Sequence, residues 1–341
     1  MGMMFGRKGV FGRIGISRFL QWRLNTYLMW MLPFSWMQTY IGLLGKIFFY
    51  FNRKERHIIR RNIRLIVGDF RNDQPIERVI QRTFKGIFTH YAEKLFIAYT
   101  NLGRAFKFLR KNVVVEGREL LDDALAQGKG VIFVTGHYGA VEFLPTVLGL
   151  EGYALTMLLR FKTKDLKRSL NNRIKSAGDV KITLVDVTES RNVMFEAMKA
   201  LKSNQIVITE CDEFEEWRPC QRRRNRFLGR NVPFDRTLDM LQKRSKSPAV
   251  MGIVQRRPGG RFVLKLHSLI REGSRRKEDV SLPQKALTTL ERYITEAPYQ
   301  WYQWKDASYI LQSEIAEMTG PVPATEEVPV VPLEDTPVHA F

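Results

Sequence analysis

The middle of the chain alternates between two patterns of apolar residues. Short apolar runs bounded by glycine or charged residues predict buried strands, whereas apolar residues recurring every three or four positions predict helices. The predicted strands cover residues 113–115, 131–135, 154–159, 181–185 and 205–209. The predicted helices between them cover residues 119–126, 141–150, 165–177 and 192–202. This alternation predicts an α/β fold in which helices flank a central, mostly parallel sheet.

The last part of the sequence changes the sheet from parallel to mixed. Two apolar runs, 249–254 and 262–267, flank an Arg-Arg-Pro-Gly-Gly-Arg connection, which is typical of a hairpin between antiparallel strands. Residues 282–296 then predict a further helix. We therefore expect a mixed, mostly parallel sheet.

The first 52 residues carry a different pattern. Residues 24–45 lack charge and are rich in Trp, Tyr and Phe, with basic residues on both sides. A helix that crosses a bilayer needs about 20 mostly apolar residues, and aromatic side chains favour the headgroup level. Pro33 and Gln38 interrupt the run, so a spanning helix, a helical hairpin and an interfacial helix stay open. We predict a helical, membrane-associated segment over residues 1–52; a helix buried in a soluble protein is the alternative.

Charge is distributed unevenly along the chain. The net charge is +20, yet residues 312–341 hold six acidic residues and no Lys or Arg, so the preceding residues carry +26. Such a body attracts polyanions: nucleic acid, an anionic bilayer surface or an acidic carrier protein. The acidic, Pro-rich stretch 312–341 predicts a disordered tail, and residues 53–311 predict one domain.

Cofactor and nucleic-acid chemistry find little support in the sequence. Two cysteines, Cys211 and Cys220, are too few and wrongly spaced for a zinc site, and they favour a reducing compartment. The chain has no Gly-rich phosphate loop of the nucleotide-binding kind and no recognised nucleic-acid module. We therefore expect no metal, no bound cofactor and no nucleic-acid partner.

The candidate chemistry lies where the predicted strand 131–135 ends. His137 follows that strand in a Gly-His-Tyr-Gly-Ala-Val-Glu stretch, and Glu142 lies five positions later at the predicted start of a helix. There Glu142 can accept a hydrogen bond from one ring nitrogen and leave the other nitrogen as a base for a hydroxyl. Backbone amides at the start of the helix can then stabilise an oxyanion. A packed or capping histidine is the alternative.

Several segments together resemble a known family. They are residues 56–63 (RHIIRRNI), 128–132 (GKGVI), 136–142 (GHYGAVE), 227–229 (FLG) and 298–304 (PYQWYQW). In this order they resemble the lysophospholipid acyltransferase superfamily, and most closely the bacterial lipid A late (lauroyl and myristoyl) acyltransferases, over about residues 24–304. The chain departs from the family at Asp212-Glu213, where Asp-Gln is usual, and after Trp304.

The resemblance implies an activity and a location. It implies a membrane-bound O-acyltransferase that moves a fatty acyl chain from an acyl-carrier protein or coenzyme A to a hydroxyl of a glycolipid or phospholipid precursor. The place implied is the cytoplasmic face of a bacterial inner membrane, with residues 53–311 as the catalytic domain. His137 is the expected general base and Glu142 its orienting partner. No covalent acyl-enzyme is expected, although Cys211 is a possible nucleophile.

Other residues are expected to contact substrates. Arg160 falls where the family carries a substrate-binding arginine, and Arg230 belongs to a basic stretch that suits phosphorylated headgroups or an acidic carrier protein. Gly136 and Gly139 of the motif, with Asp212 and Glu213, complete the predicted substrate-binding set. Asp212 and Glu213 can instead serve to neutralise the basic stretch.

Two rival functions stay open at this point. One is a non-catalytic, basic protein on the same scaffold that binds lipid headgroups at a membrane surface. The other is a nucleic-acid binder, which accounts for the charge but not for the apolar N-terminal segment.

Overall fold

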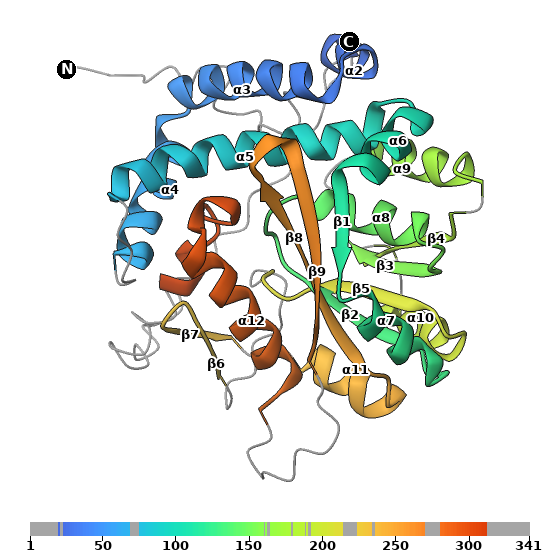
Figure 1. The fold of residues 1–341 in the computed structure, drawn as a ribbon. Helices are drawn as coiled ribbons and strands as arrows, with labels where there is room; N and C mark the ends of the chain where they lie inside the picture. Colours follow the sequence, from blue (N-terminus) through green and yellow to red (C-terminus); the bar gives the residue numbers. More distant parts are fainter. Residues whose placement is uncertain are drawn as a thin grey trace, which may run out of the picture.

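A central sheet of seven strands organises the molecule (Figure 1). The computed structural model describes residues 20, 23–68, 75–159, 161, 164–178, 180–187, 189, 192–213, 224–233, 236–269 and 280–311. The strand order is β1 (Val113–Glu116), β9 (Arg261–Ser268), β8 (Ala249–Arg257), β2 (Val131–Thr135), β5 (Ile206–Glu210), β3 (Leu155–Leu159) and β4 (Ile182–Asp186). The predicted tail over residues 312–341 lies outside the described residues.

The sheet is mixed and mostly parallel, as predicted. Neighbouring strands pair in parallel except β8 and β9, which form the expected antiparallel hairpin. β2 lies near the middle, and all five of its residues are buried, which explains its continuous apolar sequence. The residues that follow β2 therefore emerge at the centre of one sheet edge.

Helices cover both sides of the sheet. On one side in Figure 1 lie α5 (Ile76–Tyr99), α6 (Leu102–Asn112), α8 (Leu144–Leu150) and α9 (Lys164–Lys175). On the other side lie α7 (Arg118–Ala126), α10 (Val193–Lys202) and α11 (Thr237–Ser245). The helix α12 (Leu282–Glu296) packs beside α11 and near the end of β2, where the Leu290 side chain approaches Gly136.

Three local features differ from the sequence prediction. The single helix predicted over residues 141–150 is a 3₁₀ turn, η2 (Val141–Phe143), followed by α8. The basic stretch contains a hairpin of β6 (Arg224–Phe227) and β7 (Arg230–Pro233). Its Leu228-Gly229 turn has φ of +53° and +76°, which suits a two-residue hairpin turn. The helix α6 was also not predicted.

The apolar N-terminal run forms two helices rather than one. These are α2 (Arg23–Met31) and α3 (Phe34–Phe51), separated at Pro33, and the basic α4 (Arg53–Val67) follows. The buried face of α3 packs against α5 so closely that a Cβ atom on Gly45 would lie 2.2 Å from the Phe88 ring. Within the described part of the chain, no helix combines the length and apolar character needed to cross a bilayer. The spanning helix, one of the three arrangements left open by the sequence, therefore has no support, and membrane association stays a prediction.

Candidate active site

His137 and Asp212 meet at the carboxyl ends of two adjacent parallel strands. His137 lies just after β2 and Asp212 just after β5, and these strands pair with Thr135 opposite Glu210. The ring Nδ1 of His137 lies 2.9 Å from Asp212 Oδ1, and the His137 amide donates to both carboxylate oxygens at 3.0 and 3.1 Å. The crevice at the carboxyl ends of parallel strands is the usual ligand site of open α/β sheets.

Burial and a hydrogen bond from Trp301 hold the Asp212 side chain in place. Its side chain is fully buried, and the indole Nε1 of Trp301 donates to Asp212 Oδ2 at 2.8 Å. Trp301 and Trp304 are both buried and pack edge to face. The C-terminal aromatic motif therefore fixes the carboxylate that orients the histidine ring.

The second ring nitrogen of His137 faces two more carboxylates. Its Nε2 lies 3.3 Å from Glu210 Oε2 and 3.6 Å from Glu213 Oε1. Burial of the ring lowers the pKa of His137, but Glu210, Asp212 and Glu213 outweigh it and raise that pKa to about 10. At neutral pH the ring is therefore mainly an imidazolium, with its side chain 12% exposed.

Within the described residues, His137, Glu210 and Glu213 are the group that could hold a metal ion. One ligand atom each from His137, Glu210 and Glu213 lie within 4.8 Å of one another. Ion pairing with an imidazolium accounts for the same grouping without a metal. The expectation that the site works without a metal stays a prediction.

Glu142 lies elsewhere, and its predicted pairing with His137 is wrong. Neither a hydrogen bond nor an ion pair joins these two described side chains. The Glu142 carboxylate is 3.2 Å from Lys94 Nζ and 3.6 Å from His90 Nε2, both on α5. Between the two residues, Gly139 has a φ of +59° and Glu142 then lies in η2. Asp212 already occupies Nδ1 of the ring.

The motif glycines shape the turn that carries His137. A Cβ atom on Gly139 would lie 1.8 Å from the Val254 carbonyl oxygen, so both the positive φ and the close approach require glycine. At Gly136 the nearest neighbour of a Cβ atom is Leu290, at 2.7 Å. Contact of either glycine with substrate stays a prediction.

The amides of this turn are already hydrogen bonded. Those of His137, Tyr138, Gly139 and Ala140 donate to Asp212, Gly136 O, Gln300 O and Val254 O respectively. These four N–H groups therefore do not supply an oxyanion site, and the role expected for amides at the start of the following helix stays a prediction.

A buried ion pair braces the same turn from β8 and α5. The guanidinium of Arg256 donates to both carboxylate oxygens of Glu93 at 2.7 Å and to the Gly139 carbonyl at 2.6 Å. Glu93 is fully buried, and burial raises its pKa although Arg256 opposes that shift. A paired, bidentate arrangement of this kind is how a charge is tolerated inside a protein.

The remaining predicted site residues have mixed outcomes. Asp212 and Glu213 lie at His137. Arg160 is outside the described residues. Arg230 lies on β7, where its guanidinium approaches the Leu65 carbonyl at 3.4 Å. Cys211 is fully buried, and burial raises its pKa well above the usual range, which disfavours it as a nucleophile.

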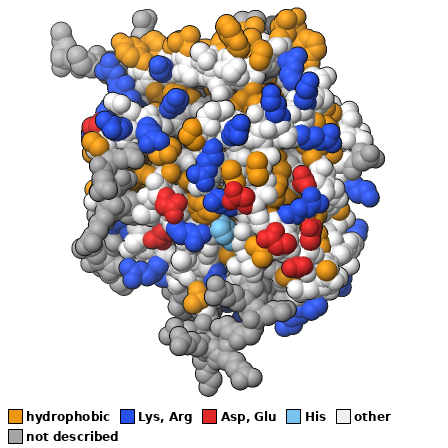
Figure 2. Space-filling view, viewed as in Figure 1, with side chains coloured by type: hydrophobic (Ala, Val, Ile, Leu, Met, Phe, Trp, Pro, Cys, Tyr) orange, Lys and Arg blue, Asp and Glu red, His pale blue; other side chains and the backbone are white. Residues whose placement is uncertain are grey.

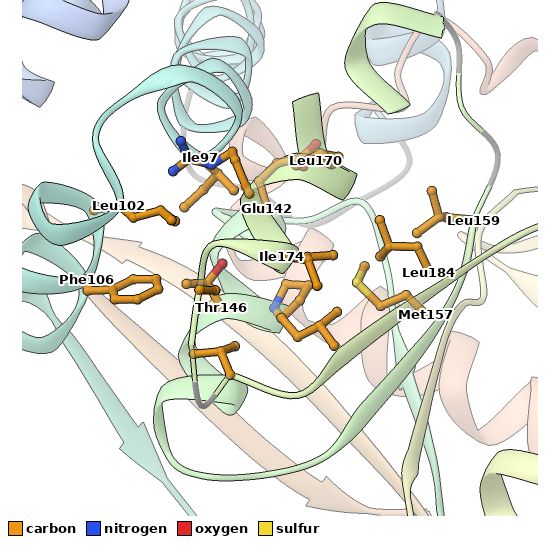
Figure 3. A pocket seen from close by; sticks show the side chains of 16 residues that line it. Ile97, Leu102, Phe106, Glu142, Thr146, Met157, Leu159, Leu170, Ile174 and Leu184 are labelled. Atoms are coloured by element: carbon orange, nitrogen blue, oxygen red, sulfur yellow. The ribbon is translucent and has the colours of Figure 1, made fainter. Parts of the chain in front are cut away.

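An apolar cavity opens beside Glu142. It encloses about 700 Å³, including space open to solvent, and lies between α5, α6, α8, α9, β3 and β4. Figure 3 shows Phe106 and Leu102 on one side, Met157 and Leu184 on the other, and Glu142 between them. The charged lining residues are Glu142 and Arg173, whose guanidinium donates to the Thr100 carbonyl.

Sequence reasoning missed Lys94 and His90. Both lie on α5, one turn apart, so they share a helix face. The available signal was a histidine and a lysine one turn apart on a helix that also carries other charged residues: Glu77, Arg78, Arg82, Lys85 and Glu93. Apolar residues recur every three or four positions along this helix, and that pattern by itself indicates a packed helix and not a site.

Fold and site together define the class. The chain is an α/β protein with a carboxylate-oriented histidine at the carboxyl ends of parallel strands, beside an apolar cavity. The sequence profile of the bacterial lipid A biosynthesis acyltransferases matches residues 16–305, and the chain belongs to this family. The resemblance described above is thereby confirmed: the protein is an acyltransferase that acts on lipid precursors. No curated protein matches the chain.

Proposed function

We propose that this acyltransferase moves a fatty acyl chain from a thioester to a hydroxyl of a glycolipid or phospholipid precursor, with His137 as general base. The observation that carries the proposal is the bond between His137 Nδ1 and Asp212, which leaves Nε2 as the reactive nitrogen. Asp212 fixes the tautomer and stabilises the imidazolium that forms when the hydroxyl loses its proton. The acyl group passes directly from donor to acceptor.

The cavity is the proposed site of the acyl chain. Its lining is almost wholly apolar, and one of its lining residues is Glu142, in the motif that carries His137. An acyl chain inserted there leaves its thioester carbon at the mouth, where a hydroxyl and the histidine can meet.

The donor is proposed to be an acyl-carrier protein or coenzyme A. Both carry negative charge, and the body of the chain is strongly basic. Opposite charge favours encounter between the donor and this surface. The choice between the two donors belongs to experiment.

The N-terminal helices are proposed to hold the protein at the cytoplasmic face of a bacterial inner membrane. The outer stripe of α3 exposes Trp36, Leu43, Ile47 and Tyr50 to solvent, with Trp36 68% exposed. Figure 2 shows hydrophobic side chains along this edge and Lys and Arg side chains beneath them. An apolar, aromatic face bordered by basic residues suits a helix lying in the interface of an anionic bilayer.

Replacing His137 tests the proposed function. The assay measures thiol release from lauroyl-coenzyme A by purified protein, with a bacterial lipid extract in detergent micelles as acceptor. We expect His137→Ala to lower kcat by at least about 10²-fold. His57→Ala, an exposed histidine on α4, is the control and should keep full activity. Equal rates above the uncatalysed rate would show that His137 is not the base, and release by both proteins at the uncatalysed rate would favour the non-catalytic lipid-binding alternative.

A further inference from the structure

Acyl transfer needs a group that stabilises the oxyanion of the tetrahedral intermediate. Preorganised donors at that oxygen usually contribute the largest single part of catalysis. The four turn amides from His137 to Ala140 are already bonded within the protein. A donor outside these four amides has to take this task.

Lys94 is placed to do so. Its Nζ lies 3.2 Å from Glu142 Oε1, and the side chain is 26% exposed. An ammonium has three N–H donors, and Glu142 is the one hydrogen-bond acceptor that the described residues offer it. Two donors are thus left for a ligand.

The ammonium is charged and belongs to the same group of side chains as the histidine. Burial lowers the pKa of Lys94, but Glu142, Glu210 and Glu213 outweigh it and raise that pKa, so the group stays charged. Glu210 and Glu213 are the same carboxylates that lie 3.3 and 3.6 Å from His137 Nε2. Contacts link the two residues: one turn from Lys94 on α5, the His90 ring stacks on Tyr302 with 3.6 Å between ring centroids, and Tyr302 meets the His137 ring edge to face at 5.2 Å. Lys94, Glu142, His90, Tyr302 and His137 therefore form one cluster.

The cavity reaches this cluster at Glu142. Glu142 lines the cavity and holds Lys94 at the same time. An acyl chain in the cavity thus brings its carbonyl group to the ammonium. This step rests on the proposed function.

We propose that Lys94 is a further catalytic residue, whose ammonium stabilises the oxyanion of the tetrahedral intermediate, and that Glu142 positions it. The acceptor oxygen bonds to the thioester carbon as its proton passes to Nε2 of neutral His137, and the carbonyl π electrons move to oxygen. Lys94 binds this O⁻. When the carbonyl re-forms, the C–S bond breaks and the thiolate sulfur takes the proton from the imidazolium.

Kinetics with two donors tests the proposal. Lauroyl-coenzyme A carries phosphates, and lauroyl-N-acetylcysteamine carries none. We expect Lys94→Met to lower kcat by about 10²–10³-fold with both donors, with KM changed by less than about threefold. Lys94→Arg should recover part of kcat, and Lys85→Met, on an exposed position of the same helix, should match wild type. A raised KM for the coenzyme A thioester alone, or an unchanged kcat, overturns the proposal.

A binding measurement separates this proposal from the proposed function. Calorimetry compares laurate, whose carboxylate imitates the oxyanion, with 1-dodecanol. Lys94→Met should weaken the binding of laurate about tenfold and leave the binding of 1-dodecanol unchanged. Equal laurate affinities of wild type and Lys94→Met overturn the role of Lys94. The binding measurement can be read even if wild type transfers no acyl group. That absence of transfer would contradict the proposed function and not the role of Lys94 in binding an anion. If Lys94→Met does not fold, Lys94→Gln and Glu142→Gln replace it, with losses of kcat expected for both.

Discussion

Asp212 binds His137 twice, through the backbone amide and through the ring Nδ1, although 75 positions separate the two residues. The double contact fixes both where the ring lies and which nitrogen carries the proton. Trp301 completes the arrangement by donating to the other Asp212 oxygen. The histidine of the motif is thus oriented by the neighbouring strand and not by its own helix.

Replacing this carboxylate should impair catalysis without unfolding the protein. In Asp212→Asn the amide oxygen can still accept from the His137 backbone, but the negative charge that stabilises the imidazolium is lost. We expect kcat to fall by about 10²–10⁴-fold. Asp239→Asn is the control, because Asp239 is also buried but accepts from the Leu282 amide. A kcat within tenfold of wild type for Asp212→Asn would contradict the orienting role.

The rate should depend on pH through His137. A base must be neutral, and its neighbours hold the pKa of His137 at about 10. We therefore expect kcat/KM to rise with pH until about pH 10. Glu213→Gln removes one of the charges that raise this pKa, so its profile should move to lower pH. A wild-type profile that is flat above pH 7 would show that another group sets the rate.

Stability should depend on pH in the opposite sense. The pKa of His137 is raised in the folded protein from an ordinary value of 6.5 to about 10. The contribution of protonated His137 to the free energy of unfolding is complete below pH 6.5 and is lost as the pH rises through 10. The free energy of unfolding of wild type relative to His137→Gln should thus be largest near pH 6 and shrink towards pH 10. A difference that grows with pH would refute this.

The turn at Gly139 should tolerate no side chain. Gly128 also has a positive φ, +69°, but open space surrounds its missing Cβ atom, so Gly128→Ala should cost about 1–2 kcal/mol. Gly139→Ala adds a clash with the Val254 carbonyl, and we expect about 1–3 kcal/mol more. Denaturant unfolding measures both variants, and equal losses would argue against the close contact.

The outer stripe of α3 should govern membrane binding. Burying an aromatic side chain contributes about 1.5–3 kcal/mol, so Trp36→Ser with Tyr50→Ser should weaken binding to anionic vesicles at least about tenfold. Phe195→Ser is the control, since Phe195 is similarly exposed on α10, away from α3. Cosedimentation with vesicles measures the partition, and an unchanged value for the double variant would exclude this face.

The sequence by itself determined the elements of the sheet and the location of the chemistry. Strands such as β2 and β5 are short apolar runs, and the turn after β2 needs glycine, so local pattern was enough to find them and His137. Even the β8–β9 hairpin follows from its Pro-Gly-Gly connection. These features depend on contacts between residues close in the chain.

Only the tertiary structure decided which groups act together. The adjacency of β2 and β5 brings Asp212 to His137, and the packing of α5 brings Lys94 to Glu142, 48 positions away. Periodicity reports which face of an element is buried, not which element lies beside it. Strand order and helix packing are set by the total burial of apolar surface across the whole chain, so the partners of a catalytic side chain become known only when the fold does.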